Sequence, residues 1–257
     1  MERALGVVVG TGIGGQRDIA KALIDEGFEV KTVQTMWPRD HYVYFNGRYV
    51  KNASAGSIVG NPFAEGGEVL TGTDFLLVSD LAYLNRSISG RLSKEPTYGQ
   101  IKEAIASEGR AHHPEARIHI APTGYFHGGK GHVHIDMFTL LLPKKRILML
   151  DTFYGKGAGR ANEYDAIAES EGLTLMRYDG SQDGVWYPLN APVLPTERGE
   201  IVVVDEKARS LTTILRDAGV PTLGVEMPQH TYPAGKIRCQ TNTYRIGDSP
   251  ELLLSGM

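Results

Sequence analysis

The hydrophobic pattern of the chain alternates between helix-like stretches and short apolar runs. Four helix-like stretches end at a glycine after a small or acidic pair, which is a common C-terminal stop of a helix. These endings are Asp25-Glu26-Gly27, Ser107-Glu108-Gly109, Ser170-Glu171-Gly172 and Asp217-Ala218-Gly219. An extended segment follows each ending, at 28–33, 117–121, 173–178 and 220–225. The pattern predicts a helix followed by a strand, four times along the chain.

Paired extended segments joined by tight turns lie upstream of the helix-like stretches. The clearest pair is 42–45 and 48–51 around Asn46-Gly47, because Asn-Gly between alternating residues is a strong hairpin signal. Similar hairpins are predicted at 68–80, 137–151 and 191–205, and their second arms end alike, at Asp80, Asp151 and Asp205. The chain is therefore expected to repeat a β-β-α-β module.

The two ends of the chain hold parts of one further module. Residues 5–9 read as a strand, 14–26 as a helix and 28–33 as a second strand, but no hairpin arm precedes them. Residues 236–246, near the C-terminus, form an extended segment without a partner. Joining the two ends would complete a module. Since no linker rich in Pro, Gly or Ser interrupts the chain, we expect one α+β domain over residues 1–257.

Composition limits the partners and the cellular location that we expect for this domain. The 257 residues are 41% hydrophobic, enough for a substantial core, and the net charge is only −3. The longest basic run is Lys144-Lys145-Arg146, so a nucleic-acid partner is not expected. The first apolar run is too short for a secretion signal, and no segment reaches the length of a membrane span. With one cysteine, these features indicate a cytoplasmic protein that acts away from membranes.

Four short motifs carry candidate chemistry. Cys239, the only cysteine, follows Gly-Lys-Ile-Arg and is either core filler or a nucleophile. His134 and Asp136 are two residues apart among β-branched and aromatic neighbours typical of a strand, which predicts both side chains on one face of a strand. Glu65 precedes two glycines, and Asp40 ends Trp-Pro-Arg-Asp. Each of these motifs also suits an ordinary turn, a surface ion pair or a structural His-carboxylate pair.

The chain resembles the guanidino-group modifying enzymes, because it carries four of their motifs in the same order. These are Pro-Arg-Asp (38–40), Glu-Gly-Gly (65–67), His-Ile-Asp (134–136) and the C-terminal Cys239. The enzymes of this family are the arginine and agmatine deiminases, dimethylargininases and amidinotransferases. The resemblance runs along most of the chain. It implies the pentein fold, an α/β propeller in which five pseudo-symmetric ββαβ modules surround a central active site.

The resemblance also implies roles for individual residues. Cys239 would be the nucleophile, His134 the general acid and base, and the carboxylates of Asp40, Glu65 and Asp136 would surround a small cationic guanidino substrate. Carboxylates suit a planar cation because they accept its paired hydrogen bonds. The resemblance does not identify the group that would bind the substrate's far end, for which Arg39, Lys236 and Arg238 are candidates. Neither a metal nor an organic cofactor is required.

The expected reaction is hydrolysis through a covalent S-alkylthiouronium, which releases ammonia or an amine and leaves a ureido product. Passing the amidino group to an acceptor amine is the nearest alternative. A pentein that binds without catalysis is another, and a homodimer is left open. The sequence departs from the family at Lys236, where a glycine is common, and at Glu68, where Asp or Ser often follows Glu-Gly-Gly.

Two further patterns compete with this reading. Residues 10–15 carry the glycine spacing of a dinucleotide-binding turn, but the next strand lacks the acidic residue that would hold a ribose. His132, His134 and Asp136 could present three metal ligands on one strand face, with His127 nearby, as in a zinc hydrolase. A metal site would leave Cys239, Glu65 and Asp40 without a role.

Overall fold

In the computed structural model of the chain, the described residues are 5–12, 14–51, 66–84, 90–125, 132–157, 162–228 and 236–254. The helices are α1 (Gln16–Asp25), α3 (Tyr98–His112), α4 (Asn162–Glu171), α5 (Arg209–Asp217) and α6 (Pro250–Leu254). The strands are β1 (Leu5–Gly10), β2 (Val30–Val33), β3 (Tyr42–Phe45), β4 (Arg48–Lys51), β5 (Val69–Thr71), β6 (Phe75–Ser79), β7 (Arg117–Ala121), β8 (Gly124–Tyr125), β9 (His132–Val133), β10 (Thr139–Leu142), β11 (Ile147–Asp151), β12 (Thr174–Tyr178), β13 (Val193–Thr196), β14 (Gly199–Asp205), β15 (Thr222–Val225) and β16 (Thr241–Arg245).

The predicted β-β-α-β module recurs in the sheets. Sheets β5-β6-β7, β10-β11-β12 and β13-β14-β15 each pair two strands antiparallel and then add a parallel third strand. A helix connects the second and third strands in each case, because a parallel neighbour needs a long crossover. The hairpin β3-β4 is also confirmed, with Phe45 opposite Arg48 across the Asn-Gly turn.

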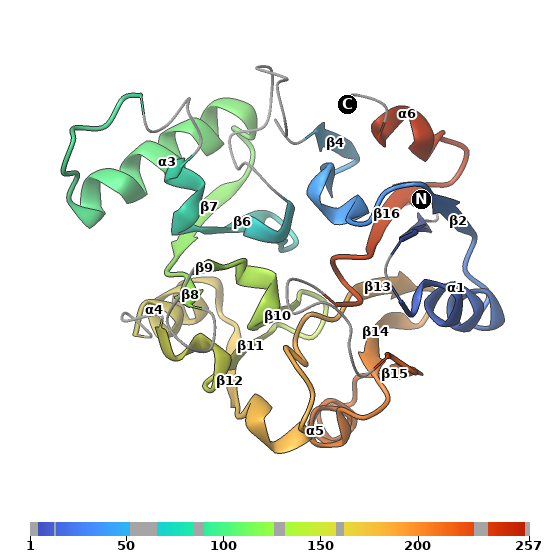
Figure 1. Cartoon of the computed structure of the whole chain (residues 1–257). Coiled ribbons are helices and arrows are strands. Elements are labelled where there is room, and N and C mark those ends of the chain that lie inside the picture. Colours follow the sequence, from blue (N-terminus) through green and yellow to red (C-terminus); the bar gives the residue numbers. More distant parts are fainter. Residues whose placement is uncertain are drawn as a thin grey trace.

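The two ends of the chain complete one module, as predicted. Strand β16 pairs antiparallel with β1, and β1 pairs in parallel with β2 after helix α1. Figure 1 shows the red β16 beside the blue N-terminal strands, and it shows the sheets around a common centre with α1, α3 and α5 toward the outside. In this arrangement the strand that follows Cys239 is a first hairpin arm, equivalent to β3, β5, β10 and β13.

Both faces of a central strand are buried, which explains the near-continuous apolar runs in the sequence. Along β11, Leu148 and Leu150 pack in one cluster with residues of α4, whereas Ile147 and Met149 pack in another with residues of α5. The sheet therefore lies between the helix of its own module and the helix of the next. This packing joins neighbouring modules and holds the ends of their first arms in place.

The aspartates that end the second arms tie each strand to nearby backbone. Asp80 Oδ1 accepts a hydrogen bond from Thr123 N at 3.0 Å, and Asp205 Oδ1 accepts one from Lys207 N at 3.0 Å. Asp151 Oδ1 accepts three backbone N–H groups. The repeated Asp in the sequence is thus a structural feature of the module.

One predicted helix end is wrong. Gly27, Gly172 and Gly219 have positive φ values of 91°, 60° and 68° and follow their helices as expected. Helix α3, however, continues through the buried Gly109 to His112. Its end comes directly before His113-Pro114, because proline disfavours helical backbone at the preceding residue. A buried glycine in a helix can instead serve close packing.

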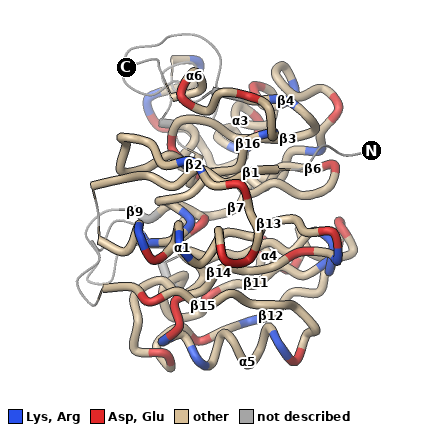
Figure 2. Tube along the Cα trace, turned by 90° about the vertical axis from the view of Figure 1, so that its right-hand side faces the viewer, with Lys and Arg blue, Asp and Glu red and all other residues tan. Residues whose placement is uncertain are grey.

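An ion-pair cluster joins two modules at the outside. Arg117 in β7 contacts Glu171 at the end of α4 and Asp74 in the β5-β6 turn, both at 2.8 Å, and His119 also contacts Glu171. Basic and acidic residues lie close to one another at many places along the trace in Figure 2.

Among the described residues, no helix combines the length and apolar character that a membrane crossing needs.

We expect Glu171→Gln to destabilise the fold by about 1–2 kcal/mol near neutral pH, which lowers Tm by about 2–6 °C. Hydrogen bonds from Arg117, and then from His119, lower the pKa of Glu171 from 4.5 to about 2. A lowered carboxyl pKa stabilises the fold above the unfolded pKa, and this contribution is lost as pH falls toward the folded pKa. The Tm difference should therefore shrink as pH falls from about 5 toward 2.

Calorimetry across this pH range measures the difference. Glu163→Gln is the matched control, because Glu163 pairs with Lys102 at 2.9 Å in a more exposed position, with side-chain exposures of 25% and 39%. A Tm difference for Glu171→Gln that stays constant over the pH range would contradict the linkage.

Candidate active site

The candidate residues share a position in the module, directly before a first hairpin arm. Asp40 precedes β3, Asp136 precedes β10 and Cys239 precedes β16. Three short 3-10 helices occupy this position, at Pro38–Asp40, Gly66–Glu68 and Ile135–Met137, and the second contacts both of the others. The repeat therefore brings together motifs that are far apart in the sequence.

The predicted strand through His134 and Asp136 is wrong. Strand β9 ends at Val133, and the chain then turns into the 3-10 helix Ile135–Met137, with a hydrogen bond from Met137 N to His134 O of 3.0 Å. The turn buries Asp136 completely and leaves the His134 side chain 26% exposed. Strand alternation therefore does not set the directions of these two side chains.

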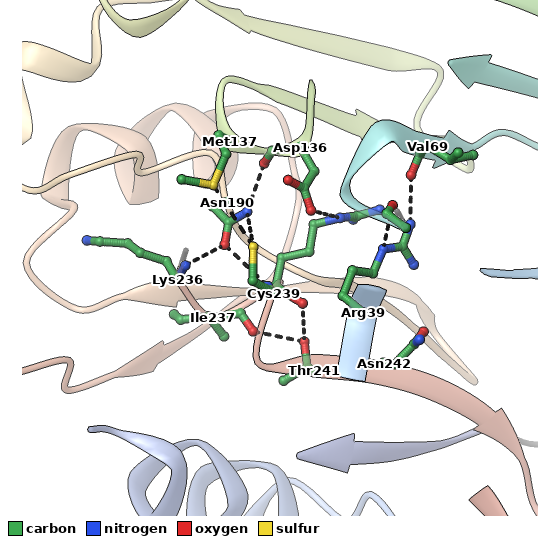
Figure 3. A network of polar contacts seen from close by, with 12 residues as sticks. Arg39, Val69, Asp136, Met137, Asn190, Lys236, Ile237, Cys239, Thr241 and Asn242 are labelled. Carbon is green, nitrogen blue, oxygen red and sulfur yellow. Dashed lines mark hydrogen bonds and ion pairs between the residues drawn. The ribbon is translucent and has the colours of Figure 1, made fainter. Parts of the chain in front are cut away.

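Cys239 lies in the turn that leads into β16 and is 3% exposed. Thr241 Oγ1 donates to Ile237 O at 3.0 Å, which closes the turn around the cysteine. The thiol sulfur lies 3.3 Å from Asn190 Nδ2 and 4.0 Å from Met137 Sδ (Figure 3). The sulfur is thus inside the protein, next to the 3-10 helix that carries Asp136.

Asn190, which sequence reasoning missed, holds the cysteine turn. Its Nδ2 donates to the Cys239 sulfur and to Asp136 O at 3.1 Å, while its Oδ1 accepts from Lys236 N at 2.9 Å and from Cys239 N at 3.4 Å. Asn190 is 1% exposed. The only signal in the sequence is a polar residue between Leu189 and Ala191, directly before a predicted hairpin arm.

The environment of Cys239 disfavours the thiolate in the structure as it stands. Burial raises the pKa of the Cys239 thiol, and the negative charges of Asp136 and Asp40 raise it further. The Asn190 amide acts in the opposite direction, because a hydrogen bond to sulfur favours the charged form. A cation that enters the site would offset the carboxylate charges and favour the thiolate.

Asp136 faces a guanidinium of this chain. Arg238 Nε lies 3.4 Å from Asp136 Oδ2, and both residues are buried, with Arg238 9% exposed. Burial lowers the pKa of Arg238, and the charge of Asp136 raises it. A guanidinium can therefore lie beside this carboxylate in its present geometry.

Arg39 connects two of the 3-10 helices. Its Nε donates to Gly66 O at 3.1 Å and its Nη2 donates to Val69 O at 2.7 Å, both from a side chain that is 8% exposed (Figure 3). Burial, and then the nearby charge of Arg238, lower the pKa of Arg39 to about 9. Arg39 thereby fixes the segment that contains Gly67 and Glu68.

Glu68 is the carboxylate beside His134. Its Oε1 lies 3.7 Å from His134 Nε2, and Glu68 is 5% exposed. The backbone at Gly67 passes so close that an added Cβ would lie 2.3 Å from His134 Nδ1. The second glycine of Glu-Gly-Gly therefore makes room for the imidazole, and Glu68 orients it.

The other candidates are placed as follows. Asp40 is partly exposed at the end of its 3-10 helix. Lys236, a candidate for the far end of a substrate, instead pairs with Asp205 at 3.0 Å, with both side chains buried. Glu65 lies outside the described residues, as does His127. Within the described ranges, no group of three or more His, Cys, Asp or Glu residues is arranged to hold a metal ion.

The Asn190 contact predicts a change in thiol acidity. In Asn190→Asp, a carboxylate oxygen can still accept from the backbone, but the donor to sulfur is replaced by a negative charge. We expect the pKa of Cys239 to rise by at least about 1 unit. Because Cys239 is the only cysteine, its ¹³Cβ resonance in selectively labelled protein reports the titration directly. Asn162→Asp, at an exposed position, is the control and should leave the titration unchanged.

The described fold matches several solved structures at low sequence identity. Agmatine deiminase of Enterococcus faecalis is 14% identical, with a TM-score of 0.62 over 95% of this chain and 94% of that chain. DDAH from Pseudomonas aeruginosa, complexed with citrulline, is 8% identical, with a TM-score of 0.61 over 95% of this chain and 100% of that chain. An inosamine-phosphate amidinotransferase from Streptomyces griseus is 15% identical, with a TM-score of 0.55 over 91% of this chain and 80% of that chain.

No family model matches the chain, and no curated protein matches its sequence. The likeness therefore rests on three-dimensional structure, which covers nearly the whole chain in each comparison. It agrees with the β-β-α-β modules and with the completion of one module by the two ends of the chain. The chain has the fold of the guanidino-modifying pentein superfamily.

Proposed function

We propose that this protein is a cysteine-dependent hydrolase of a small guanidino compound. The observation that carries the proposal is the gathering of Cys239, Asp136 and the His134-Glu68 pair at equivalent ends of the first arms. A buried carboxylate that already faces a guanidinium stands beside a thiol in this arrangement. Such a site can hold the planar cation and attack its central carbon.

The residues suggest the order of steps. Cys239 gives its proton to His134, and the thiolate attacks the guanidinium carbon while Asp136 and Asp40 hold the nitrogen atoms. His134 returns the proton to the departing nitrogen, the C–N bond breaks, and an S-alkylthiouronium remains. His134 then takes a proton from water, and the hydroxide adds to the same carbon. The C–S bond breaks, the Cys239 sulfur takes a proton back from His134, and the new hydroxyl gives its proton to the released ammonia or amine, which leaves the ureido product and the free enzyme. The cationic substrate favours the thiolate that the free site disfavours.

The comparisons support the substrate class. The solved neighbours include deiminases that act on agmatine and arginine, and two were obtained with a ligand bound as cysteine-to-serine mutants. By analogy with them, we infer a single-domain, five-module propeller with a central site. The roles of Glu65, Asp40 and Arg39 toward a substrate stay predictions, as do the cytoplasmic location and the homodimer.

Mass spectrometry of the products tests the proposal. The protein is incubated with arginine, agmatine, methylated arginines and guanidino acids, each with and without glycine or lysine as an acceptor. A ureido product formed in water alone supports hydrolysis. A product that appears only with an acceptor would identify amidino transfer, the activity of the Streptomyces griseus neighbour. The absence of any product across the panel would favour a binding protein.

Gly67→Ala is expected to lower kcat/KM by about 100-fold, since a new Cβ 2.3 Å from His134 Nδ1 must displace the general acid. Steady-state kinetics with the substrate found above measure the effect. Gly99→Ala in α3 is the matched control, because its new Cβ would have its nearest neighbour at 3.9 Å. Unchanged kinetics in Gly67→Ala would remove His134 from the mechanism.

A further inference from the structure

A cavity of about 620 Å³ opens at the other end of the first arms. The candidate active-site residues precede these strands, whereas the cavity is lined by the turns that follow them, including Gly47, Thr73 and Lys144. The cavity and the thiol site therefore lie at opposite ends of the same set of strands.

Arg39 and Arg238 belong to both ends. They precede β3 and β16 at the active-site end, and both residues also line the cavity. Arg39 uses Nε and Nη2 to bind backbone carbonyls. In the described part of the chain, the Arg238 guanidinium has its ion pair with Asp136 but donates no hydrogen bond, and its Nε is buried. A guanidinium carries five N–H donors, so several remain for a ligand.

The charge of the cavity favours an anion. Lys144 and Arg245 add to the two buried arginines, and Glu200 is the acidic residue among the lining side chains that the structure describes. The Glu200 carboxylate accepts backbone N–H groups of Lys144 at 3.4 Å and Lys145 at 3.2 Å. Its charge is therefore directed toward the β10-β11 turn. Buried donors without acceptors are costly, and an oxyanion satisfies paired N–H groups better than water does.

We propose that this cavity is a binding site for a small oxyanion, such as a carboxylate, phosphate or sulfate, held at its deep end by Arg238 and Arg39. An anion there shares Arg238 with Asp136, so it draws the guanidinium away from that carboxylate. Asp136 then becomes more available to a cation beside Cys239. This coupling rests on the proposed function, whereas the binding of the anion does not.

Titration with sodium sulfate tests the binding, with the ionic strength held constant by a bulky buffer anion. Sulfate binding is followed by the Nε–Hε resonances of Arg39 and Arg238 in ¹H–¹⁵N spectra. Each resonance is assigned by its absence from the spectrum of the corresponding variant, Arg39→Lys or Arg238→Lys. We expect saturable shifts of both resonances in the unmodified protein and at least about 10-fold weaker binding in Arg238→Lys, because lysine loses the paired donors. Shifts that are absent, or that grow linearly without saturation, would overturn the proposal.

Thr73→Glu gives a second test that leaves the buried arginines in place. Thr73 is exposed in the β5-β6 turn and lines the cavity, so a carboxylate there should weaken sulfate binding by about 3-fold or more. Thr174→Glu is the matched control, at an exposed position away from the cavity lining. Equal sulfate affinity in the two variants would place the anion elsewhere. Because no substrate is needed, a negative result here leaves the proposed hydrolase untouched.

Discussion

Substitution of Cys239 by alanine is expected to reduce kcat by at least about 10⁴-fold, since Cys239 is the proposed nucleophile and no other thiol in the chain can replace it. The change removes one buried sulfur from a turn that the Thr241 hydroxyl and the Asn190 amide oxygen hold by hydrogen bonds to backbone groups, so the fold should persist. Product formation measured by mass spectrometry gives the effect on turnover. Intact-mass analysis of the acid-quenched unmodified protein should show the covalent adduct, and the variant should show none.

Met137→Leu is the control for disturbed packing around the sulfur. Met137 Sδ lies 4.0 Å from the thiol, and a Met-to-Leu change keeps nearly the same volume. We expect its kcat to stay within a few-fold of the unmodified value. Activity that survives in Cys239→Ala would refute the thiol mechanism and would direct attention to metal analysis of His132, His134 and Asp136.

Asp136→Asn is expected to change thiol acidity and turnover in opposite directions. The negative charge of Asp136 raises the pKa of Cys239, so its removal should lower that pKa and speed alkylation of the thiol. The same change removes the buried carboxylate that would hold the substrate cation. We therefore expect kcat/KM to fall by about 10³-fold while the thiol becomes more reactive.

The ¹³Cβ titration of Cys239 and steady-state kinetics measure the two effects on the same variant. Loss of the Asp136 charge also leaves Arg238 without its ion-pair partner, so Tm is recorded to confirm that the variant is folded. Asp165→Asn is a suitable control, because Asp165 pairs with Arg177 at a half-exposed surface position. A variant that loses turnover and thiol reactivity together would indicate a structural role for Asp136 only.

Local sequence signals were sufficient for most of the fold. The Asn46-Gly47 turn and the repeated Asp at the second-arm ends located the hairpins, because turn chemistry and strand alternation act over a few residues. The local signals failed at two places, the end of helix α3 and the segment that holds His134 and Asp136. Gly109 does not stop its helix, since Pro114 sets the end of α3. Asp136 lies within a 3-10 helix that begins directly after His134, which strand periodicity cannot reveal.

The sequence by itself determined the module pattern, the joining of the two chain ends and a set of candidate side chains, because these follow from residue type and spacing. Only the tertiary structure decided which of them meet. The Asn190 amide donates a hydrogen bond to the sulfur of Cys239, 49 positions away in the sequence. Arg238 forms an ion pair with Asp136, and Lys236 forms one with Asp205. Such pairings depend on how the modules pack, since the ends of the first arms are brought together by the buried strand faces and helices of neighbouring modules.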